Sequence, residues 1–415
     1  MNRAAVAIVE PAYYGRGYVV AAKDLGLQVV AIVSNIDLLD EFNYRHLVDF
    51  IVEEKDTIEP LYLIEAVRNA PCFDSINAII AGNEFLLETC ARVSSHFGFK
   101  TNSEDSYKAS LDKYLARELY LGAGIPSLRY VDLLDVDEVG RITSYVGFPG
   151  VIKPVDSWSS QGVKICRSVD ELISYFGETL QSKNQFGYRH QKKFIFEEYI
   201  GGAEYSVELF LLNGELVFNY ITAKRTSSPP YCDEIGHILP ANISLELSSR
   251  LVSVSFQAVK AIGLTQGPMH VEVKFDGDRI RIIETNARPG GDFIATRLLP
   301  LASGIDLYKL HIMAMLNYPI DLPATSPQQA AAIRFVYPAS SGIFQRLCGI
   351  DQATAIPGVV EVLQHKETGA YVHGGTDNNS RLAHVIAVGP TADHAEEAIE
   401  KAVAILTPVI TSDPI

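Results

Sequence analysis

Two carboxylates, an amide and an arginine recur at short spacing in the stretch HVEVKFDGDRIRIIETNARPGG, residues 270–291. The carboxylates are Glu272 and Glu284, and Asn286 and Arg288 follow the second of them. Two carboxylates and an amide oxygen form an oxygen-only ligand set, which suits Mg²⁺ when the ion also holds substrate phosphates. An arginine beside such a site can clamp a phosphoryl group during transfer. The stretch therefore predicts chemistry on a metal nucleotide.

The same stretch has the pattern of a β-hairpin that brings the two carboxylates together. Strand alternation puts Glu284 on one face with three residues of its own strand, namely Ile280, Ile282 and Asn286. A turn centred on Asp278 would pair Glu272 directly with Glu284, whereas one centred on Gly277 would make them diagonal neighbours. Adjacent carboxylates repel unless a cation lies between them, so the pair indicates a cation. The alternative is a solvated hairpin with surface acids, and the ETNARPGG ending counts against it.

A lysine at the end of a short apolar strand is a second candidate for phosphate binding. Lys153 follows residues 150–152 and leads toward a Ser- and Gly-rich loop, residues 156–162, that contains Ser160. A lysine can meet a phosphate there as a point charge, and hydroxyl and N–H groups of the loop can cover it. The loop is not a Walker loop, because G-x-x-x-x-G-K-[ST] is absent. A surface lysine is the alternative, and Lys113 on a polar helix carries less weight alone.

The segment FEEYIGGAEYSVE, residues 196–208, has the pattern of an interdomain hinge. A strand ends in Glu-Glu-Tyr-Ile and breaks at Gly201-Gly202. Exposed backbone groups there could read an adenine edge, and Glu204 could accept hydrogen bonds from ribose hydroxyls. An ordinary acidic strand end is the alternative interpretation.

The elements that would position these residues are those of an α/β protein. Strands at residues 4–9, 28–33 and 76–80 alternate with helices, which predicts a doubly wound N-terminal domain; a further strand is expected at 46–52. The first loop lacks G-x-G-x-x-G, so we exclude a dinucleotide site there. Two stretches at strand ends, residues 11–17 and 82–84, are candidates for holding a small substrate or are simply tight turns. After Pro327 new strands and a closing helix suggest a separate C-terminal domain.

Composition and net charge limit the kinds of partner that we expect. The 415 residues carry a net charge of −15, and without a basic excess a nucleic-acid partner is disfavoured. No apolar run approaches the ~18 residues of a membrane span, and the N-terminus lacks a signal-peptide cleavage pattern. The five cysteines form no C-x-x-C pair. We therefore expect reduced thiols in a cytoplasmic protein that neither enters a membrane nor binds nucleic acid.

Taken in order, these motifs resemble the ATP-grasp superfamily over roughly residues 1–400. The order is a lysine helix, a Gly-Phe-Pro-x-x-x-Lys-Pro strand, a Ser/Gly loop, a Glu-Glu-Tyr-Ile hinge and a Glu…Glu-x-Asn-x-Arg-Pro-Gly-Gly hairpin. The last motif is closer to carboxylate–amine ligases than to D-alanine–D-alanine ligases. The chain looks most like L-amino-acid ligases that form dipeptides, including those of the bacilysin and dapdiamide pathways. Glu234-x-x-His237, in a predicted loop before a long helix, fits, because those ligases place an acid and a histidine there against the substrates.

The resemblance implies a fold of the α/β class with ATP-grasp architecture. Residues 1–105 would form an N-terminal α/β domain, residues 106–190 the central ATP-grasp lobe, and residues 191–325 the second lobe with the metal site. Residues 326–415 would form a small lid-like α/β domain. The polar segment 222–241 and the Ser/Gly loop would be lids that exclude water.

The resemblance also implies roles at the nucleotide. Lys113 and Lys153 would contact the ATP phosphates, with Ser160 in the covering loop, and Glu204 would bind ribose. The adenine would lie against the hinge residues Glu197, Glu198, Tyr199 and Ile200, with the carbonyl of Glu198 and the N–H of Ile200 as partners.

The remaining roles concern the metal and the substrates. Mg²⁺, or alternatively Mn²⁺, would be bound by Glu272, Glu284 and Asn286. Arg288 would steady an acyl phosphate and the tetrahedral intermediate. Glu234 would attract the ammonium of an amino-acid substrate, and His237 would lie near the reacting centre.

These roles imply an ATP-dependent ligase that joins a carboxylate substrate to an amino acid and is a homodimer, as many of its relatives are. The product could be a dipeptide or a peptide antibiotic. One alternative is a carboxylase-type ATP-grasp enzyme acting on bicarbonate or a purine intermediate, although a biotin-attachment motif is absent. A nucleotide-binding protein without turnover is another, but it should have lost a metal ligand or Arg288.

Overall fold

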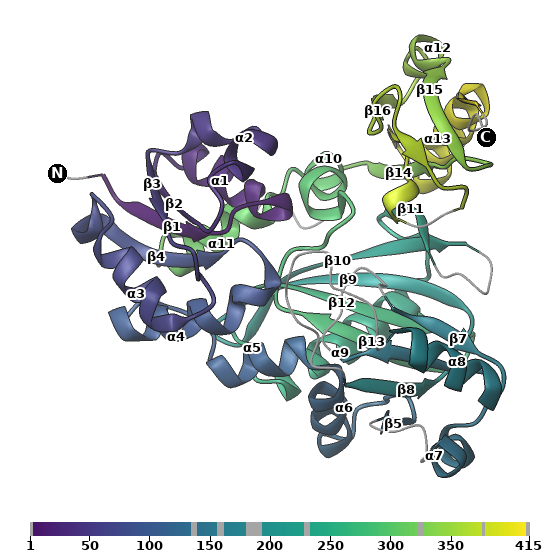
Figure 1. Cartoon of the computed structure of the whole chain (residues 1–415), viewed down its shortest axis with the longest axis horizontal. Coiled ribbons are helices and arrows are strands. Elements are labelled where there is room, and N and C mark those ends of the chain that lie inside the picture. Colours follow the sequence, from purple (N-terminus) through teal and green to yellow (C-terminus); the bar gives the residue numbers. More distant parts are fainter. Residues whose placement is uncertain are drawn as a thin grey trace.

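The computed structural model describes residues 3–133, 139–155, 162–179, 193–227, 233–321, 328–375 and 378–411. Figure 1 shows an N-terminal layer, a two-sheet central body and a C-terminal unit that projects from it. This arrangement confirms the predicted α/β class and ATP-grasp architecture. Among the described residues, no helix is both long and apolar enough to cross a membrane.

The N-terminal layer is a four-stranded parallel sheet in the order β3-β2-β1-β4. Its strands are β1 (Ala5–Val9), β2 (Gln28–Val33), β3 (Phe50–Glu53) and β4 (Ile76–Ala81). Helices α1 (Arg16–Asp24), α3 (Pro60–Arg68) and α4 (Leu87–Phe97) pack on it. Uninterrupted apolar strands such as AVAIV are typical of a sheet covered on both faces. The third strand begins at Phe50 rather than His46, because residues 45–47 form a 3₁₀ turn.

The polar helix predicted to carry Lys113 is two helices, α5 (Glu104–Leu111) and α6 (Lys113–Gly122). Asp112 interrupts them with φ −105° and ψ 105°, and its carboxylate accepts from the N–H of Leu115 at 3.0 Å. An aspartate in this capping position satisfies a backbone donor that the helix start leaves unpaired. Asp112 therefore places Lys113 at the first position of α6.

The smaller central sheet is antiparallel, in the order β5-β8-β6-β7. Its strands are β5 (Tyr130–Leu133), β6 (Gly150–Pro154), β7 (Lys164–Cys166) and β8 (Phe194–Glu198). Helices α7 (Val139–Val146) and α8 (Val169–Thr179) share one apolar core with it. This lobe carries Lys153 on β6 and the hinge at the end of β8.

The larger sheet has eight strands, in the order β13-β12-β9-β10-β11-β14-β18-β16. Its first part comprises β9 (Ala203–Leu212), β10 (Glu215–Thr226), β11 (Glu234–Leu239), β12 (Gly267–Phe275) and β13 (Ile280–Asn286), with α9 (Leu245–Ala261) packed on it. Its second part comprises β14 (Ala330–Val336), β16 (Val359–Gln364) and β18 (Ala383–Gly389), covered by α13 (Ala392–Ile405).

The C-terminal region is therefore hydrogen-bonded to the central sheet. Antiparallel pairing of β11 with β14 continues the central sheet into it. A short third sheet, with strands β15 (Gly342–Cys348), β17 (Tyr371–Val372) and β19 (Thr407–Thr411), completes the region. Sequence periodicity did not predict these three strands. The boundaries near residues 105, 190 and 325 stay predictions.

A segment between these parts returns to the N-terminal layer. Helix α11 (Leu307–Met315) packs against α1, and the Tyr18 hydroxyl lies 2.8 Å from Nδ1 of His311. Both helices contribute to one apolar core with β1 and β2. Residues 307–315, assigned by sequence to the second lobe, therefore pack with the N-terminal domain.

Candidate active site between the two lobes

The β12–β13 hairpin brings the two predicted metal carboxylates face to face. Glu272 lies directly opposite Glu284, and His270 lies opposite Asn286. The register shifts between Glu272 and Val273, which makes Ile283 an extra residue on β13. The direct pairing predicted for a turn centred on Asp278 is thus confirmed, but its cause is different. The pairs Phe275–Ile280 and Lys274–Arg281 centre the turn between Gly277 and Asp278, and a uniform ladder from there would leave Glu284 on the other face, so the bulge is needed.

This bulge corrects the predicted faces of β13. Ile280 and Ile282 belong to the apolar core, together with Val271 and Val273. Glu284, by contrast, lines the cavity between the two lobes together with Glu272. Ile280 and Ile282 therefore do not share a face with Glu284 as expected, and the bulge is the cause. Asn286 lies opposite His270 but is not among the residues that line the cavity.

Cationic side chains surround the carboxylate pair. The Lys113 ammonium lies 2.8 Å from Glu284, and the Lys224 ammonium lies 2.9 Å from Glu272. Burial alone would raise the pKa of Glu272, but Lys224 and His270 hold it well below its ordinary value. Each carboxylate therefore lies beside a lysine, and both line one cavity. Their oxygens form a donor set that fits Mg²⁺.

His270 is itself held by a buried acid that sequence reasoning missed. Its Nδ1 lies 2.5 Å from Glu208 on β9, and its Nε2 lies 3.4 Å from Glu272. Burial would lower the pKa of His270, but Glu208 raises it to about 9. The Gly290 N–H donates to Glu208 at 3.2 Å. Glu208 thereby ties the metal hairpin to the loop that follows Arg288.

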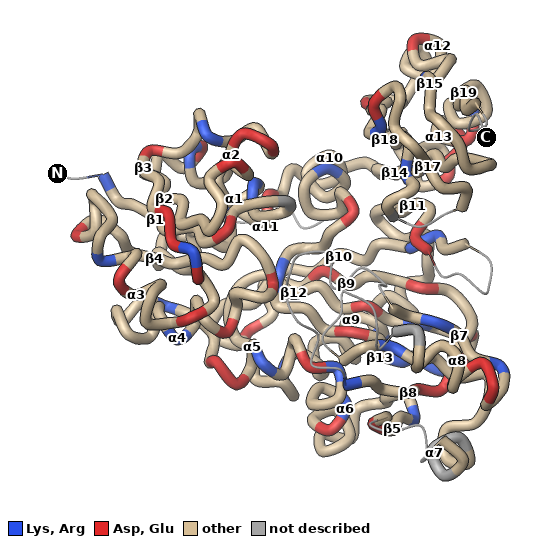
Figure 2. The backbone as a smooth tube through the Cα atoms, viewed as in Figure 1, with Lys and Arg blue, Asp and Glu red and all other residues tan. Residues whose placement is uncertain are grey.

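The cavity between the lobes has a volume of about 180 Å³. The predicted nucleotide residues among its lining residues are Lys113, Lys153, Glu197, Glu198, Tyr199, Ile200 and Glu204. Ser160 lies outside the described residues. Figure 2 shows that both acidic and basic residues occur in this region between the two central sheets. The structure therefore brings the nucleotide candidates that it describes to one place.

Glu197 is the most deeply buried of these residues. Its carboxylate pairs with Lys153 and accepts from Nε of Arg117 at 2.7 Å. Burial raises the pKa of Glu197, but Arg117 and Lys153 lower it below the ordinary value. With two cations on its carboxylate, Glu197 orients Lys153, and its contact with adenine stays a prediction. The N–H groups of Glu198 and Tyr199 donate to the carbonyls of Arg129 and Pro149, which fixes the hinge backbone.

Lys224 is the cation that sequence reasoning missed at this site. Its ammonium pairs with Glu204 at 3.2 Å, with Glu272 at 2.9 Å and with Glu234, and its side chain is 1% exposed. The sequence predicted that residues 222–241 form a lid. Instead β10 continues to Thr226, and Glu234 and His237 lie on strand β11. The cross-strand pair Lys224–Glu204 was the available signal.

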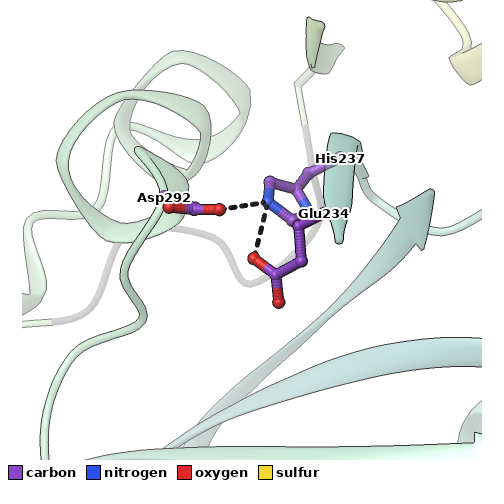
Figure 3. A group of neighbouring side chains, drawn as sticks. All are labelled: Glu234, His237 and Asp292. Carbon is purple, nitrogen blue, oxygen red and sulfur yellow. Dashed lines mark hydrogen bonds and ion pairs between the residues drawn. The ribbon is translucent and has the colours of Figure 1, made fainter. Parts of the chain in front are cut away.

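Glu234, His237 and Asp292 converge beside the carboxylate pair (Figure 3). Nε2 of His237 lies 3.4 Å from Asp292 and 3.6 Å from Glu234. Burial lowers the pKa of His237. Burial and Asp292 raise the pKa of Glu234 to about 8 against the opposing effect of Lys224. A mainly neutral imidazole beside two acids is suited to receiving an ammonium group. Sequence reasoning missed Asp292. It directly follows the Arg-Pro-Gly-Gly motif, but its partners are distant in the chain.

Arg288 lies where two cavities meet. It lines the nucleotide cavity and also a second cavity of about 1000 Å³ between the N-terminal layer and the loop after β13. Its guanidinium pairs with Glu84 and lies 5.5 Å from the ring centroid of Tyr14. Both predicted substrate stretches, residues 11–17 and 82–84, contribute to this second cavity.

The fold and this site define an ATP-grasp protein, and comparison with protein families agrees. Residues 146–297 match the ATP-grasp domain. Residues 334–411 match the L-amino acid ligase C-terminal domain 2. The chain therefore contains an ATP-grasp domain followed by an L-amino acid ligase C-terminal domain.

Individual relatives span nearly the whole chain. An uncharacterized protein, y4rH, of Sinorhizobium fredii (strain NBRC 101917 / NGR234) is 27% identical over 97% of this chain and 82% of its own. A formate-dependent phosphoribosylglycinamide formyltransferase of Francisella tularensis is 24% identical over 94% of each chain. The crystal structure of an L-amino acid ligase from Bacillus licheniformis superposes with a TM-score of 0.82 at 18% identity, covering 99% of this chain and all of that one. At that identity, the superposition shows the fold.

Proposed function

We propose that this protein joins a carboxylate substrate to the amine of an amino acid, with ATP consumed and an acyl phosphate as intermediate. The observation that carries the proposal is the position of Arg288, which lines both the nucleotide cavity and the larger cavity beside it. A phosphoryl group leaving ATP in one cavity would meet a carboxylate from the other at this guanidinium. Arginine can hold such a group through paired hydrogen bonds while it moves.

The nucleotide half of the site accounts for the first step. Lys113, Lys153 and Lys224 converge on the cavity and would neutralise the phosphates as the carboxylate attacks the γ-phosphorus. Mg²⁺, or Mn²⁺, held by Glu272, Glu284 and Asn286, would spread the charge of that transfer. Hinge residues 197–200 would hold adenine and Glu204 the ribose.

The second step would use the acids beside His237. The amine arrives as an ammonium ion. Asp292 would supply a negative charge beside it, and Glu234, whose pKa is raised to about 8, would accept a hydrogen bond from it. His237, whose pKa burial lowers, can accept a proton from it. The free amine then attacks the acyl carbon, the amide C–N bond forms, and the C–O bond to phosphate breaks. Arg288 would hold the departing phosphate.

A carboxylase acting on bicarbonate or a purine intermediate is the second candidate. Its support is the 24% identity to formate-dependent phosphoribosylglycinamide formyltransferase, which concerns the purine intermediate and not bicarbonate. The match of residues 334–411 to the L-amino acid ligase C-terminal domain favours an amino-acid substrate instead. On the same ground we propose a dipeptide product, as in antibiotic pathways that use such ligases, and a homodimeric enzyme.

A substrate screen tests this proposal. Pairs of L-amino acids, and of N-acyl amino acids with amino acids, are incubated with Mg²⁺ and ATP, and ADP, phosphate and product mass are measured. We expect ADP release that depends on both substrates and a product whose mass is the sum of the two substrates less one water. Arg288→Ala should abolish ligation while retaining much of the nucleotide binding. Full ligation by that variant, or ATP binding without turnover of any pair, would refute the assignment.

A further inference from the structure

Arg381 reaches the active site from the C-terminal domain. It precedes β18 in the chain, and its guanidinium grips the Asp292 carboxylate at both oxygens, with distances of 2.8 and 2.7 Å. Only 11% of the Arg381 side chain and 22% of the Asp292 side chain are exposed. A paired contact between a planar guanidinium and a carboxylate fixes direction as well as charge.

The rest of the guanidinium is engaged around the same point. Nη2 donates to the carbonyl of Glu234 at 3.1 Å, and the Tyr337 hydroxyl donates to that carbonyl at 2.8 Å. Nε of Arg381 donates to the Tyr337 hydroxyl at 3.2 Å, and its guanidinium carbon lies 3.5 Å from the ring centroid of Phe335. Arg381 therefore holds both the strand that carries Glu234 and the loop that carries Asp292.

The backbone of that loop requires such support. Asp292 and Phe293 are consecutive residues with φ of 47° and 65°, in the left-handed region. Non-glycine residues there are disfavoured and persist where the surroundings determine them. Arg381 supplies that constraint through the Asp292 side chain. The result is a pair of acids held at 3.4 and 3.6 Å from Nε2 of one histidine, His237.

We propose that Arg381 is a positioning residue for the amine-acceptor half of the site, which rests on the ligase function proposed above. It acts through Asp292 and the Glu234 backbone, and it keeps both acids aimed at the incoming ammonium. The lysines that face the phosphates lie on α6, β6 and β10 and are not among its partners. Arg381 should therefore affect capture of the amine and leave formation of the acyl phosphate intact.

Two half-reactions separate these effects. Hydroxylamine, a small nucleophile with no carboxylate or side chain, attacks the acyl carbon, the C–N bond forms, the C–O bond to phosphate breaks, and a hydroxamate results. Its formation from ATP and an L-amino-acid donor reports the first step without the natural acceptor. Ligation with an L-amino-acid acceptor reports both steps. Wild-type protein, Arg381→Gln and Arg381→Lys are compared in both assays.

We expect roughly a 10- to 100-fold loss in kcat/KM for the acceptor in Arg381→Gln, the usual effect of removing a residue that orients a ligand-contacting group. Hydroxamate formation and the KM for ATP should stay near the wild-type values. Arg381→Lys should recover only part of the loss, because an ammonium cannot grip both oxygens. Asp292→Asn should show the same selective loss, and the double variant should be little worse than either single variant.

A matched control separates positioning from general loosening of the C-terminal domain. Glu396 on α13 pairs with Arg225 on β10. Arg225 lies opposite Gly236, and strand alternation puts its side chain on the other face of the sheet from Lys224 and His237. Glu396→Ala therefore breaks another link of this domain without touching the acids. It should leave both assays unchanged. Wild-type acceptor kinetics in Arg381→Gln, or an equal loss in both assays, would overturn the positioning role. Failure of wild-type protein to form hydroxamate or amide with any donor would instead refute the ligase function.

Discussion

Gly290 is the residue that lets the arginine loop lie close to the metal hairpin. A Cβ atom there would come within 2.6 Å of Oε1 of Glu208 and 2.9 Å of Nδ1 of His270. Both neighbours are buried and paired with each other, so neither can move freely. Gly291 is different, because a Cβ atom there would meet only Nη1 of Arg288, at 4.0 Å. Two adjacent glycines of one motif thus carry different constraints.

We predict that Gly290→Ala lowers the free energy of unfolding by about 1–3 kcal/mol, as overpacking of a tight interior does. It should also reduce ligation by displacing Arg288. Gly291→Ala is the matched control and should leave the unfolding free energy within about 0.5 kcal/mol of wild type. Denaturant unfolding of the two variants provides the comparison. Equal stability of both would show that Glu208 does not restrict this loop.

At the scale of single residues, sequence reasoning found the groups that belong to a linear motif. The carboxylates of the hairpin, Asn286 and Arg288 were recognised from spacing alone. Lys224, Glu208, Asp292 and Arg381 were not, because each becomes functional only through partners distant in the chain. Lys224, for example, meets Glu272 across 48 positions of sequence. A lone lysine in TAKRT gives no local sign of three facing acids.

Among the elements, α11 depends on a buried histidine. His311 is 7% exposed, and its Nδ1 lies 2.8 Å from the Tyr18 hydroxyl on α1. Burial lowers the pKa of His311 to about 4, whereas an unfolded histidine has a pKa near 6.5. Above pH 6.5 both states are neutral at this residue, so it adds no pH dependence. Below pH 6.5 the unfolded state binds the proton first, and stability falls until about pH 4.

We therefore predict that His311→Asn, which keeps a polar partner for Tyr18, makes stability less sensitive to acid between pH 6.5 and pH 4. The difference in unfolding free energy accumulated over that window should be on the order of 3 kcal/mol. Denaturant titrations at several pH values measure it. Parallel pH profiles for the two proteins would mean that His311 titrates normally in the folded state.

The strand pattern shows where sequence periodicity succeeds and fails for elements. Apolar runs located β1, β2 and β4. The bulge at Ile283 was not predicted from the sequence. An extra residue on one strand gives no compositional signal, yet it moves the side chains beyond it to the other face of the sheet. The extension of β10 to Thr226 was not predicted either, because its polar residues face a charged site rather than solvent.

At the scale of the whole molecule, the nucleotide cavity lies between the two central lobes and is lined by both. Lys153 and the hinge come from the smaller sheet, whereas Glu272 and Glu284 come from the larger one. A ligand bound there contacts both, and binding to the folded state alone stabilises it by mass action. The order of lysine, hinge and hairpin in sequence was enough to predict this architecture. The continuity of the sheet into the C-terminal region was not, since β11–β14 pairing leaves no motif.

We predict that ATP with Mg²⁺ raises the melting temperature, with about 2.7 kcal/mol of added stability at a nucleotide concentration 100 times Kd. Removal of Mg²⁺ with EDTA should remove most of the shift, because the carboxylate pair would then repel the phosphates. Glu272→Gln should weaken the dependence on Mg²⁺. An ATP-induced shift that is the same with and without the metal would contradict the assignment of the hairpin.

The central claim is that the carboxylate passes through an acyl phosphate, and oxygen transfer tests it most directly. The carboxylate substrate is labelled with ¹⁸O, ligation is run with ATP and the amine, and the released phosphate is analysed by mass. One ¹⁸O should appear in phosphate for each amide formed, because the oxygen that attacks the γ-phosphorus leaves with it when the C–O bond breaks. Amide formation accompanied by unlabelled phosphate would contradict the account.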